Sequence, residues 1–575
     1  MLRRLAPYMS KYKVYAILCP ILMILEVSVD IIIPYLMSFV VDTGIANRDI
    51  NYILRIGLLM IGFALFGMTT GIISTHLGAK AGYGFAAEVR ADAYRSVQRF
   101  SFANIDAMSV PSLITRLTTD IDMLGMVAMM SLRMAIRAPF MMLFALIMSV
   151  TVNAQLALIF AVAIPVVAIM IVFMMRKAMP IFSLMQKKVD RINAIVQEDL
   201  IGIRVIKSFN REPHEEKRFG ERNDALRDTA LKAISLIILL MPVLNLVIYA
   251  CIVAVLWFGG QMVIGGTMAP GELIAFITYI TQIMMSLMML SFYFMQLTRG
   301  QASAGRVIEV LDTESEIKNP VNPLTEVPDG SITFDDVCFR YATSSENILN
   351  DIDLSIQSGE VIGIIGSTGS SKSTLVQMIP RLYDVSRGSV SVGGHDVRDY
   401  DMEVLRDQVA FVLQKNTLVT GTIRSNMQWG KEDATDEEII DALKKAQAWE
   451  FVSQYPETID HPVAQGGANF SGGQRQRLTI ARALIKQPKV LILDDSTSAV
   501  DMHTDQKIRN TFKNELDEIT TLIIAQRIAS IQDADRIIVL DKGQIESIGT
   551  HEELLASSPI YKEISETQER GLMSA

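Results

Sequence analysis

An apolar run from Val361 to Ile365 leads directly into a loop rich in glycine and serine, and a helical pattern follows from Leu375. Glycines let backbone amides converge on a phosphate, and the start of a helix adds positive potential. This order of strand, loop and helix predicts a phosphate loop, residues 366–374, formed by Gly366, Ser367, Thr368, Gly369, Ser370, Ser371, Lys372, Ser373 and Thr374.

Two side chains of the phosphate loop have defined roles in this chemistry. Lys372 would reach the β- and γ-phosphates of a nucleotide, and the Ser373 hydroxyl would bind Mg²⁺. The motif has glycine where this chain has Ser371. Because a Cβ restricts the backbone, we expect the geometry and the nucleotide affinity of the loop to be altered there.

A second apolar strand, Val490 to Leu493, ends in the two carboxylates of Asp494 and Asp495. Asp494 would hold Mg²⁺ through water. Taken alone, such a strand end could simply face solvent. Together with the phosphate loop, it favours a nucleotide-binding site.

The sequence Phe470-Ser471-Gly472-Gly473-Gln474 precedes a helical run, which predicts a second anion site at a helix start. A single chain has no need of two such sites. A head-to-tail dimer that sandwiches nucleotide between them does need both.

These motifs occupy the acidic half of a chain of two different halves. Residues 1–310 carry 28 basic and 20 acidic side chains, whereas residues 311–575 carry 25 and 42. The acidic half is a poor partner for nucleic acid. Cys19, Cys251 and Cys338 form no metal or disulfide spacing, which favours a reducing compartment for the second half.

The basic half contains six apolar stretches long enough to span a bilayer, near 14–40, 52–77, 128–152, 154–178, 235–262 and 270–297. The two long, charged gaps between them, 78–127 and 179–234, carry basic residues on the side expected to be cytoplasmic. Their helical periodicity predicts helices that continue into the cytosol. We interpret the first span as a retained helix, not as a cleaved signal peptide.

Proline and glycine around 311–330 indicate a linker, and short β-rich runs then alternate with helices. The expected fold is an all-α six-helix transmembrane domain (1–310), a linker (311–330) and an α/β P-loop nucleotide-binding domain (331–570).

With these motifs, the chain resembles a half-transporter of the ATP-binding cassette exporter family over essentially its whole length. The Ser471–Gln474 signature carries the resemblance most specifically, and it would contact the γ-phosphate across the dimer. The resemblance implies that Tyr341 stacks on adenine and that Gln414 senses Mg²⁺. It also implies that Ser498-Ala499-Val500-Asp501 crosses to the other cassette, and that coupling helices lie near 102–111 and 209–218. Fold, ATPase activity, ATP and Mg²⁺ follow as expectations.

Two positions depart from the family pattern. The family has a glutamate as general base where this chain has Asp495, and a histidine where it has Gln526. The shorter carboxylate would hold water too far away, and glutamine cannot become a cation. With Ser371, these residues resemble the degenerate-site subunit of a heterodimeric bacterial multidrug exporter, whose partner has the consensus Glu and His. The alternative is an active homodimer that tolerates both residues.

Glu26 and Asp30 lie four residues apart within the first span, and so on one helical face. Intramembrane carboxylates mark functional faces, so the acidic pair could bind cationic cargo. Equally, it could pair with Arg133 and Arg137, which are also four residues apart.

The chain contains 33 methionines, with clusters in the last span at Met284-Met285 and Met288-Met289. Soft thioethers suit a cavity for varied apolar ligands, although most of these residues would be core or lipid-facing. The resemblance implies multidrug export from a bacterial cytoplasmic membrane, with the nucleotide-binding domain in the cytoplasm. Export of a peptide or lipid, and an ATP-gated channel or regulator, are the alternatives.

Overall fold

The computed structural model describes residues 2–342, 344–496, 500–515 and 518–573. The chain divides into two compact units. The first comprises Met1–Gln98 and Pro111–Asp312, and the second comprises Arg99–Val110 and Thr313–Ala575. The second unit therefore includes a short segment that the sequence places between two membrane spans.

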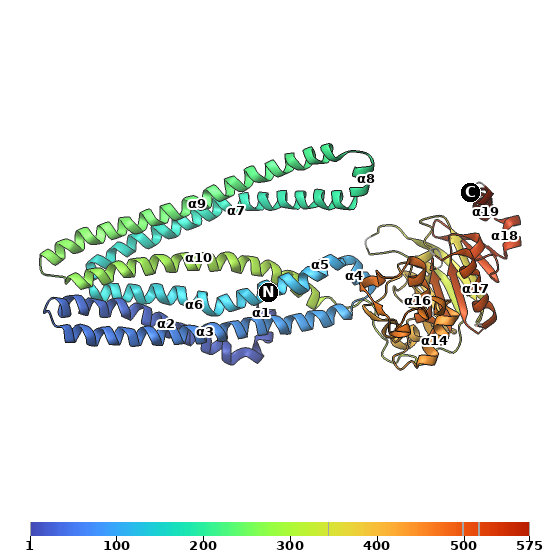
Figure 1. Ribbon diagram of the computed structural model, residues 1–575, viewed down its shortest axis with the longest axis horizontal. Coiled ribbons are helices and arrows are strands. Elements are labelled where there is room, and N and C mark those ends of the chain that lie inside the picture. The colour runs from blue at the N-terminus through green and yellow to red at the C-terminus, as the bar shows by residue number, and fades with distance from the viewer. Residues whose placement is uncertain (1, 343, 497–499, 516–517, 574–575) are drawn as a thin grey trace. The chain divides into compact units, whose positions relative to one another are not determined.

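The first unit is helical throughout, and its long helices run alongside one another (Figure 1). Within the described residues, six helical segments are long and apolar enough to cross a membrane. The main helices are α2 (Lys13–Phe39), α3 (Ile50–Gln98), α6 (Ile121–Val152), α7 (Ala154–Ile201), α9 (Glu212–Ile264) and α10 (Pro270–Asp312). Short elements complete them: α1 (Leu2–Leu5), η1 (Ala6–Tyr12), η2 (Val40–Ile45), α5 (Val110–Thr115), η3 (Arg116–Asp120) and α8 (Ile203–Ser208).

The longest helices exceed what a bilayer requires. Helix α3 has 49 residues, α7 has 48 and α9 has 53. At about 1.5 Å per residue each is roughly 70–80 Å long, against a hydrocarbon core of about 30 Å. These helices are therefore long enough to continue beyond a membrane, as the sequence leads us to expect.

The second expected coupling helix lies elsewhere than predicted. Residues 209–211 form a turn, and α9 has already begun at Glu212. The short helix is α8, Ile203–Ser208, which follows the break at Gly202. Pro213 occupies the first turn of α9, where its missing N–H costs nothing, so this proline starts a long helix instead of ending a short one.

The second unit is built on a six-stranded sheet in the order β12-β11-β3-β10-β9-β6. Its strands are β3 (Val361–Gly366), β6 (Val409–Val412), β9 (Val490–Asp494), β10 (Thr520–Ile524), β11 (Arg536–Asp541) and β12 (Gln544–Gly549). All neighbours pair in parallel except β11 and β12.

An antiparallel four-stranded sheet has the order β2-β1-β4-β5, and β7 pairs with β8. These strands are β1 (Ile332–Phe339), β2 (Leu349–Ile356), β4 (Arg387–Val392), β5 (His395–Asp396), β7 (Gly421–Thr422) and β8 (Pro462–Val463).

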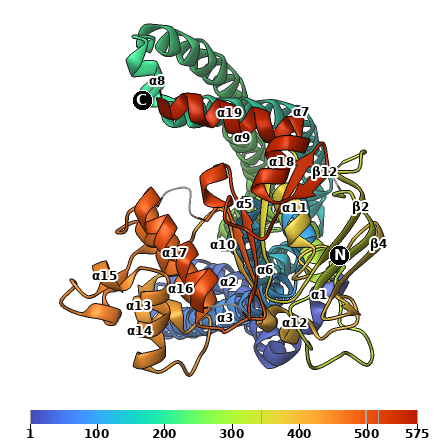
Figure 2. The same ribbon diagram turned by 90° about the vertical axis from the view of Figure 1, so that its right-hand side faces the viewer.

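Helices surround these sheets (Figure 2). They are α4 (Phe102–Met108), α11 (Lys372–Gln377), α12 (Met402–Gln408), α13 (Ile423–Met427), α14 (Asp436–Lys445), α15 (Trp449–Val452), α16 (Gly472–Leu484), α17 (Met502–Glu515), α18 (His551–Ser557) and α19 (Pro559–Met573). One apolar core joins the four-stranded sheet to β3, β9 and β10. The predicted order of an all-α membrane domain and an α/β domain is confirmed.

Candidate functional site

The register of the parallel sheet gathers the predicted nucleotide-binding residues at one edge. Ile524 at the end of β10 pairs with Ile364 on one side and with Asp494 on the other. The carboxyl ends of β3, β9 and β10 therefore lie together. The phosphate loop, the two aspartates and Gln526 follow directly from these three strand ends. This is the edge at which open parallel sheets bind ligands.

Lys372 folds back over the phosphate loop. Its ammonium donates hydrogen bonds to the carbonyl oxygens of Gly366 and Ser367, each at 2.9 Å, and to the Ser370 hydroxyl at 3.3 Å. Burial lowers the pKa of Lys372, and the nearby carboxylates of Asp494 and Asp495 oppose that shift. These carbonyls hold the ammonium where a nucleotide phosphate could replace them as its partner.

Ser371 adopts a left-handed backbone conformation, with φ 72° and ψ 23°. Glycine populates this region freely, whereas the conformation has an energetic cost for a residue with a Cβ. The restriction expected from the sequence is therefore present at Ser371. The loop keeps the glycine-type backbone and accepts strain at this position.

Ser373 and Asp494 lie next to each other, as a shared metal would require. The Ser373 hydroxyl donates a hydrogen bond of 2.9 Å to Asp494 Oδ1. Asp494 is 3% exposed, and its burial raises the pKa of its carboxyl. A hydroxyl and a buried carboxylate are hard oxygen ligands of the kind Mg²⁺ uses beside nucleotide phosphates. The residues present fit that ion.

Asp495 lies between two glutamine side chains. Gln526 Nε2 donates a hydrogen bond of 2.8 Å to Asp495 Oδ2. Burial raises the pKa of Asp495, and hydrogen bonds from Gln414 and Gln526 counteract the rise. The structure thus brings together the three residues that the sequence assigned to the base, the Mg²⁺ sensor and the switch position.

Tyr341 lies beside the phosphate loop. Its hydroxyl is 3.1 Å from Thr374 Oγ1, and its ring packs edge-on against Phe339 and Tyr383 at centroid distances of 4.8 and 5.3 Å. Burial raises the pKa of its hydroxyl. This position places an aromatic ring next to the predicted nucleotide site.

The Ser471–Gln474 signature opens α16 with a capping box. Ser471 N–H donates to Gln474 Oε1 at 2.9 Å, and Gln474 N–H donates to Ser471 Oγ at 3.3 Å. Through the described residues, no hydrogen bond joins the signature to the phosphate loop.

Of the segment expected to cross to a second cassette, Ser498 and Ala499 lie outside the described residues. The Asp501 carboxylate accepts a bond from Thr504 N–H.

Helix α4 packs against the cassette through a contact that the sequence did not reveal. Tyr383 donates a hydrogen bond of 2.6 Å to Asp106 Oδ2, and its ring lies 6.1 Å from that of Phe102. Burial and the Asp106 carboxylate raise the pKa of Tyr383. A short helix, α4, thus lies within the segment 102–111 that was expected to be a coupling helix. Because 277 residues separate Tyr383 from Asp106, no local pattern could have linked them.

The acidic pair of α2 shares a single arginine. Arg137 of α6 donates through Nη1 to Glu26 and through Nη2 to Asp30, the latter at 2.7 Å. Of the two arginines expected as partners, only Arg137 forms an ion pair with these acids within the described residues. The pairing interpretation is thus favoured over an open acidic patch.

A small apolar cavity of about 290 Å³ lies between α7, α9 and α10. Methionines and aromatic rings dominate its wall, which is formed by Ile171, Met174, Ala178, Met179, Phe182, Leu236, Leu244, Met288, Ser291, Phe292 and Met295. Of the four clustered methionines singled out in the sequence, Met288 lines this cavity, whereas Met284 is buried and Met285 is exposed.

Two family models match the chain. The model described as the ABC transporter transmembrane region matches residues 16–287, and the model described as ABC transporter matches residues 349–498. The first match lies in the first structural unit except for residues 99–110, and the second match lies in the second unit.

Curated relatives match almost from end to end. An uncharacterized ABC transporter ATP-binding protein, YfiB of Bacillus subtilis, is 37% identical over 98% of this chain and 97% of its own. The ATP-dependent lipid A-core flippase of Desulfotalea psychrophila is 31% identical over 98% of each chain. The putative multidrug export ATP-binding/permease protein YgaD of Bacillus subtilis is 30% identical, again over 98% of each.

A solved structure of a bacterial Atm1-family ABC exporter with ATP bound superposes with a TM-score of 0.79. The match covers 96% of this chain and 98% of that one, at 24% identity. This likeness concerns the fold.

Proposed function

We propose a cargo and a partner for this chain, which belongs to the ABC transporter family as an exporter half-transporter that binds ATP and couples its hydrolysis to transport. The cargo is a hydrophobic or amphipathic small molecule, exported across the cytoplasmic membrane of a bacterium. The partner is a homologous half-transporter with the consensus Glu and His. Mg²⁺ accompanies ATP, held by Ser373 and Asp494 with Gln414 nearby.

The methionine-lined cavity carries the cargo proposal. Its wall offers Met174, Met179, Met288 and Met295 together with two phenylalanines, and Ser291 supplies a single hydroxyl. Thioethers adapt to ligands of different shapes. Because the wall has few polar groups, it does not require a ligand with a particular pattern of hydrogen bonds. Such a wall suits many apolar molecules better than one polar peptide. The similarity to YgaD, named a putative multidrug exporter, is consistent with it.

The contact between Gln526 and Asp495 carries the proposed division of labour. A general base must reach a water in line with the γ-phosphate, and Asp495 is one methylene shorter than the family's glutamate. Its carboxylate already accepts a hydrogen bond from Gln526, which cannot supply the positive charge of a histidine. The site built on this chain's phosphate loop would bind ATP and turn over slowly, while Ser471–Gln474 completes the partner's active site.

Filling the cavity tests the cargo proposal. Ala178→Trp places a large ring among the methionines, and Ala161→Trp adds the same ring at an exposed position of α7 outside the cavity. We expect Ala178→Trp to lower ethidium efflux from vesicles about tenfold, with Ala161→Trp close to the unchanged protein. Equal efflux by both variants would contradict the cavity as the cargo site.

Intact masses of the complex from its own membranes test the partnership. A second chain of similar size with Glu and His at the positions of Asp495 and Gln526 is the expected result. This chain alone, as a homodimer, would contradict it.

A second candidate cargo is a lipid, favoured by the similarity to a protein named a lipid A-core flippase. Headgroup translocation in proteoliposomes, with no ethidium efflux, would select it. An ATP-gated current without cargo-stimulated hydrolysis would instead indicate a channel.

A further inference from the structure

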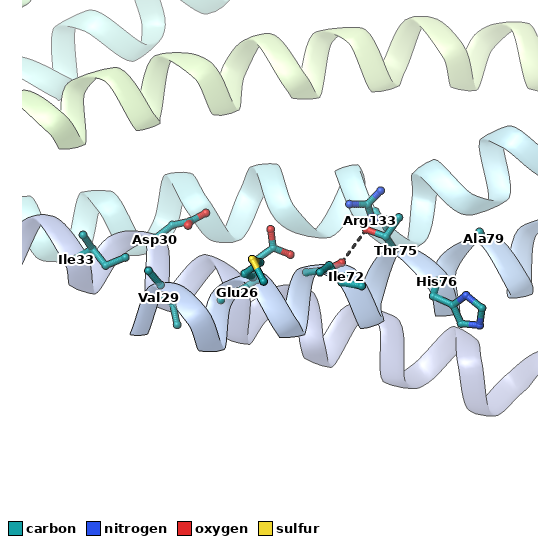
Figure 3. Close-up of a pocket in the computed structure, with 13 residues that line it drawn as sticks. Glu26, Val29, Asp30, Ile33, Ile72, Thr75, His76, Ala79 and Arg133 are labelled. Atoms are coloured by element: carbon teal, nitrogen blue, oxygen red, sulfur yellow. Dashed lines mark hydrogen bonds between the residues drawn. The ribbon is translucent and has the colours of Figure 1, made fainter. Parts of the chain in front are cut away.

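A second and larger cavity, of about 720 Å³, lies between α2, α3 and α6 (Figure 3). Its size falls within the range of cavities that hold small ligands. One part of the wall carries charge, from Glu26, Asp30 and Arg133. Thr75 and His76 are also polar, and the rest is small or apolar: Val29, Ile33, Ala64, Gly67, Met68, Gly71, Ile72 and Ala79. No element of the methionine-lined cavity contributes to it.

Two polar atoms at this cavity have no partner within the described residues. They are Glu26 Oε2 and Arg133 Nε, and both are buried. Glu26 uses its other oxygen to accept from Arg137. A buried donor or acceptor without a hydrogen bond is costly, and native proteins rarely leave one. The Glu26 and Arg133 side chains that line the cavity therefore each keep unused hydrogen-bonding capacity.

The charges at the cavity balance overall but are separated in space. Arg137 is shared between Glu26 and Asp30, while Arg133 has no carboxylate within ion-pair distance among the described residues. Figure 3 shows Asp30, Glu26 and Arg133 following one another along the groove, with His76 pointing away from them. A net cation would be repelled by Arg133 and a net anion by Glu26. The best complement is a zwitterion, with a cationic donor toward Glu26 and an anionic acceptor toward Arg133.

Gly71 makes room for the acidic end of the site. A Cβ at this position would lie 3.0 Å from the Glu26 carboxylate carbon and 3.1 Å from Oε2. The glycine thus lets the carboxylate lie directly against the α3 backbone. On the other side, the stem of Arg133 packs over Gly78, where a Cβ would lie 3.2 Å from its Cδ.

The polar groups lie at one depth in the membrane. At 1.5 Å per residue, Gly71 is about 31 Å from Ile50 and Arg133 about 28 Å from Val152, and the Glu26 carboxylate packs against Gly71 at the same depth. Those helix ends are expected on the outer side of the membrane, because the long charged gaps at the other ends of these spans carry the basic residues expected in the cytoplasm. With a hydrocarbon core of about 30 Å, the charged groups lie in the cytoplasmic leaflet, toward its headgroups.

The apolar wall runs in the direction that acyl chains would take. Ile33 lies nearer than Glu26 to the outer end of α2, and Ala64 and Met68 lie nearer than Gly71 to the outer end of α3. A lipid of the cytoplasmic leaflet has its headgroup on the inner side and its chains toward the midplane. The cavity has the same polarity.

We propose that this cavity is a binding site for a zwitterionic phospholipid of the cytoplasmic leaflet, with a primary ammonium on Glu26 and a phosphate on Arg133. Phosphatidylethanolamine has this chemistry. Phosphatidylcholine has no N–H to donate, and phosphatidylglycerol has no cation. The site is independent of the exported cargo.

Native mass spectrometry of the full transporter, purified with its partner, tests the proposal. The probes are dioleoyl phosphatidylethanolamine, phosphatidylcholine and phosphatidylglycerol at equal concentrations. We expect phosphatidylethanolamine to be retained about tenfold more strongly than either of the others, because each of those lacks one charge-assisted contact. Equal retention of all three, or a preference for phosphatidylglycerol, would overturn the proposal.

Variants locate the bound lipid. Gly71→Val should remove most of the preference by displacing the Glu26 carboxylate from the ammonium, whereas Arg133→Met should lower the retention of all three phospholipids by deleting the donor to their phosphate. Arg55→Met, an exposed arginine of α3 outside the cavity, is the matched control and should keep both the preference and the retention. Thermal unfolding verifies that each variant is folded. A preference that survives Gly71→Val, or retention that is unchanged in Arg133→Met, would overturn the site if the variant is folded.

Soluble phosphoethanolamine separates a lipid site from a headgroup site. A lipid gains most of its affinity from acyl chains on the apolar wall. We therefore expect a large excess of phosphoethanolamine to leave the bound lipid in place. Displacement of the lipid would show that the cavity takes a soluble zwitterion, and the lipid proposal would fall.

Discussion

Gln526 donates its side-chain amide to the carboxylate of Asp495 across 2.8 Å, from the ends of two adjacent parallel strands. The side chains to which the sequence assigns the general base and the switch position are therefore in direct contact. The contact links the two positions, since the carboxylate that would activate water is already engaged. A change at one position should show its full effect only when the other is changed as well.

Restoring both consensus residues should restore hydrolysis at this site. In a complex whose partner carries its catalytic Glu→Gln, Asp495→Glu with Gln526→His should raise the ATPase rate tenfold or more, because general base catalysis contributes about 10²–10⁴-fold. Each single change should give much less. Steady-state phosphate release measures the rate. The proposal of one slow and one active site would be wrong if the double variant does not raise the ATPase rate and the partner's Glu→Gln does not lower it.

Relief of strain at Ser371 should be measurable. Ser371→Gly removes a cost of about 1–2 kcal/mol for the left-handed backbone, against a glycine entropy cost of about 0.5–1 kcal/mol. Ser367→Gly, an exposed position of the same loop outside the positive-φ residues, incurs only the second cost. We expect the first variant to unfold at a higher temperature than the second.

A fluorescence design confines that measurement to the cassette. The chain has three tryptophans, of which Trp429 and Trp449 belong to the second unit and Trp257 to the first. In a Trp257→Phe background, the unfolding signal reports the nucleotide-binding domain alone. Equal melting of both glycine variants would contradict strain at Ser371.

The buried carboxyl of Asp494 should make stability depend on pH. Burial raises its pKa in the folded state. The contribution of Asp494 is then complete below an ordinary pKa of about 4 and is lost as the pH rises. Without metal, Asp494→Asn should melt progressively higher than the unchanged protein as the pH increases above about 4. Thermal unfolding in EDTA measures the difference, and saturating Mg²⁺ with ATP should reverse it.

Asp396 is a control for which the pH dependence of stability should have the opposite sign. Hydrogen bonds and charge from Arg398 outweigh burial there and lower its pKa. Its contribution is present above the unfolded pKa and is lost as the pH falls through the folded pKa. Asp396→Asn should therefore melt lower than the unchanged protein at neutral pH and converge with it in acid. The same pH trend for both variants would contradict the assignment.

Local motifs and long apolar runs could be predicted from the sequence because each depends only on residues that are close together in the chain. The phosphate loop, the strand ending in Asp494 and the six spans belong to this class. Contacts between distant segments could not be predicted. The sharing of Arg137 between Glu26 and Asp30 depends on helix packing that no spacing encodes. The segment near 209–218 was expected to form a coupling helix, but residues 209–211 form a turn and Pro213 lies in the first turn of α9.

The contact between Tyr383 and Asp106 should couple α4 to the cassette. Tyr383 is buried and donates at 2.6 Å to a carboxylate, so Tyr383→Phe removes one charge-assisted hydrogen bond, worth about 1.5–3 kcal/mol, and keeps the ring against Phe102. Where the structure describes the chain, no hydrogen bond or ring contact joins either residue directly to the phosphate loop, and the ring that Tyr383 packs against Tyr341 is kept in Tyr383→Phe. We therefore expect basal hydrolysis to persist, while cargo stimulation of the ATPase falls severalfold. Tyr400→Phe, which loses a buried bond to the Val392 carbonyl instead, is the matched control and should lose stability but keep stimulation. If both variants lose stimulation alike, the effect comes from general destabilisation of the cassette, and the coupling role of Tyr383 is wrong.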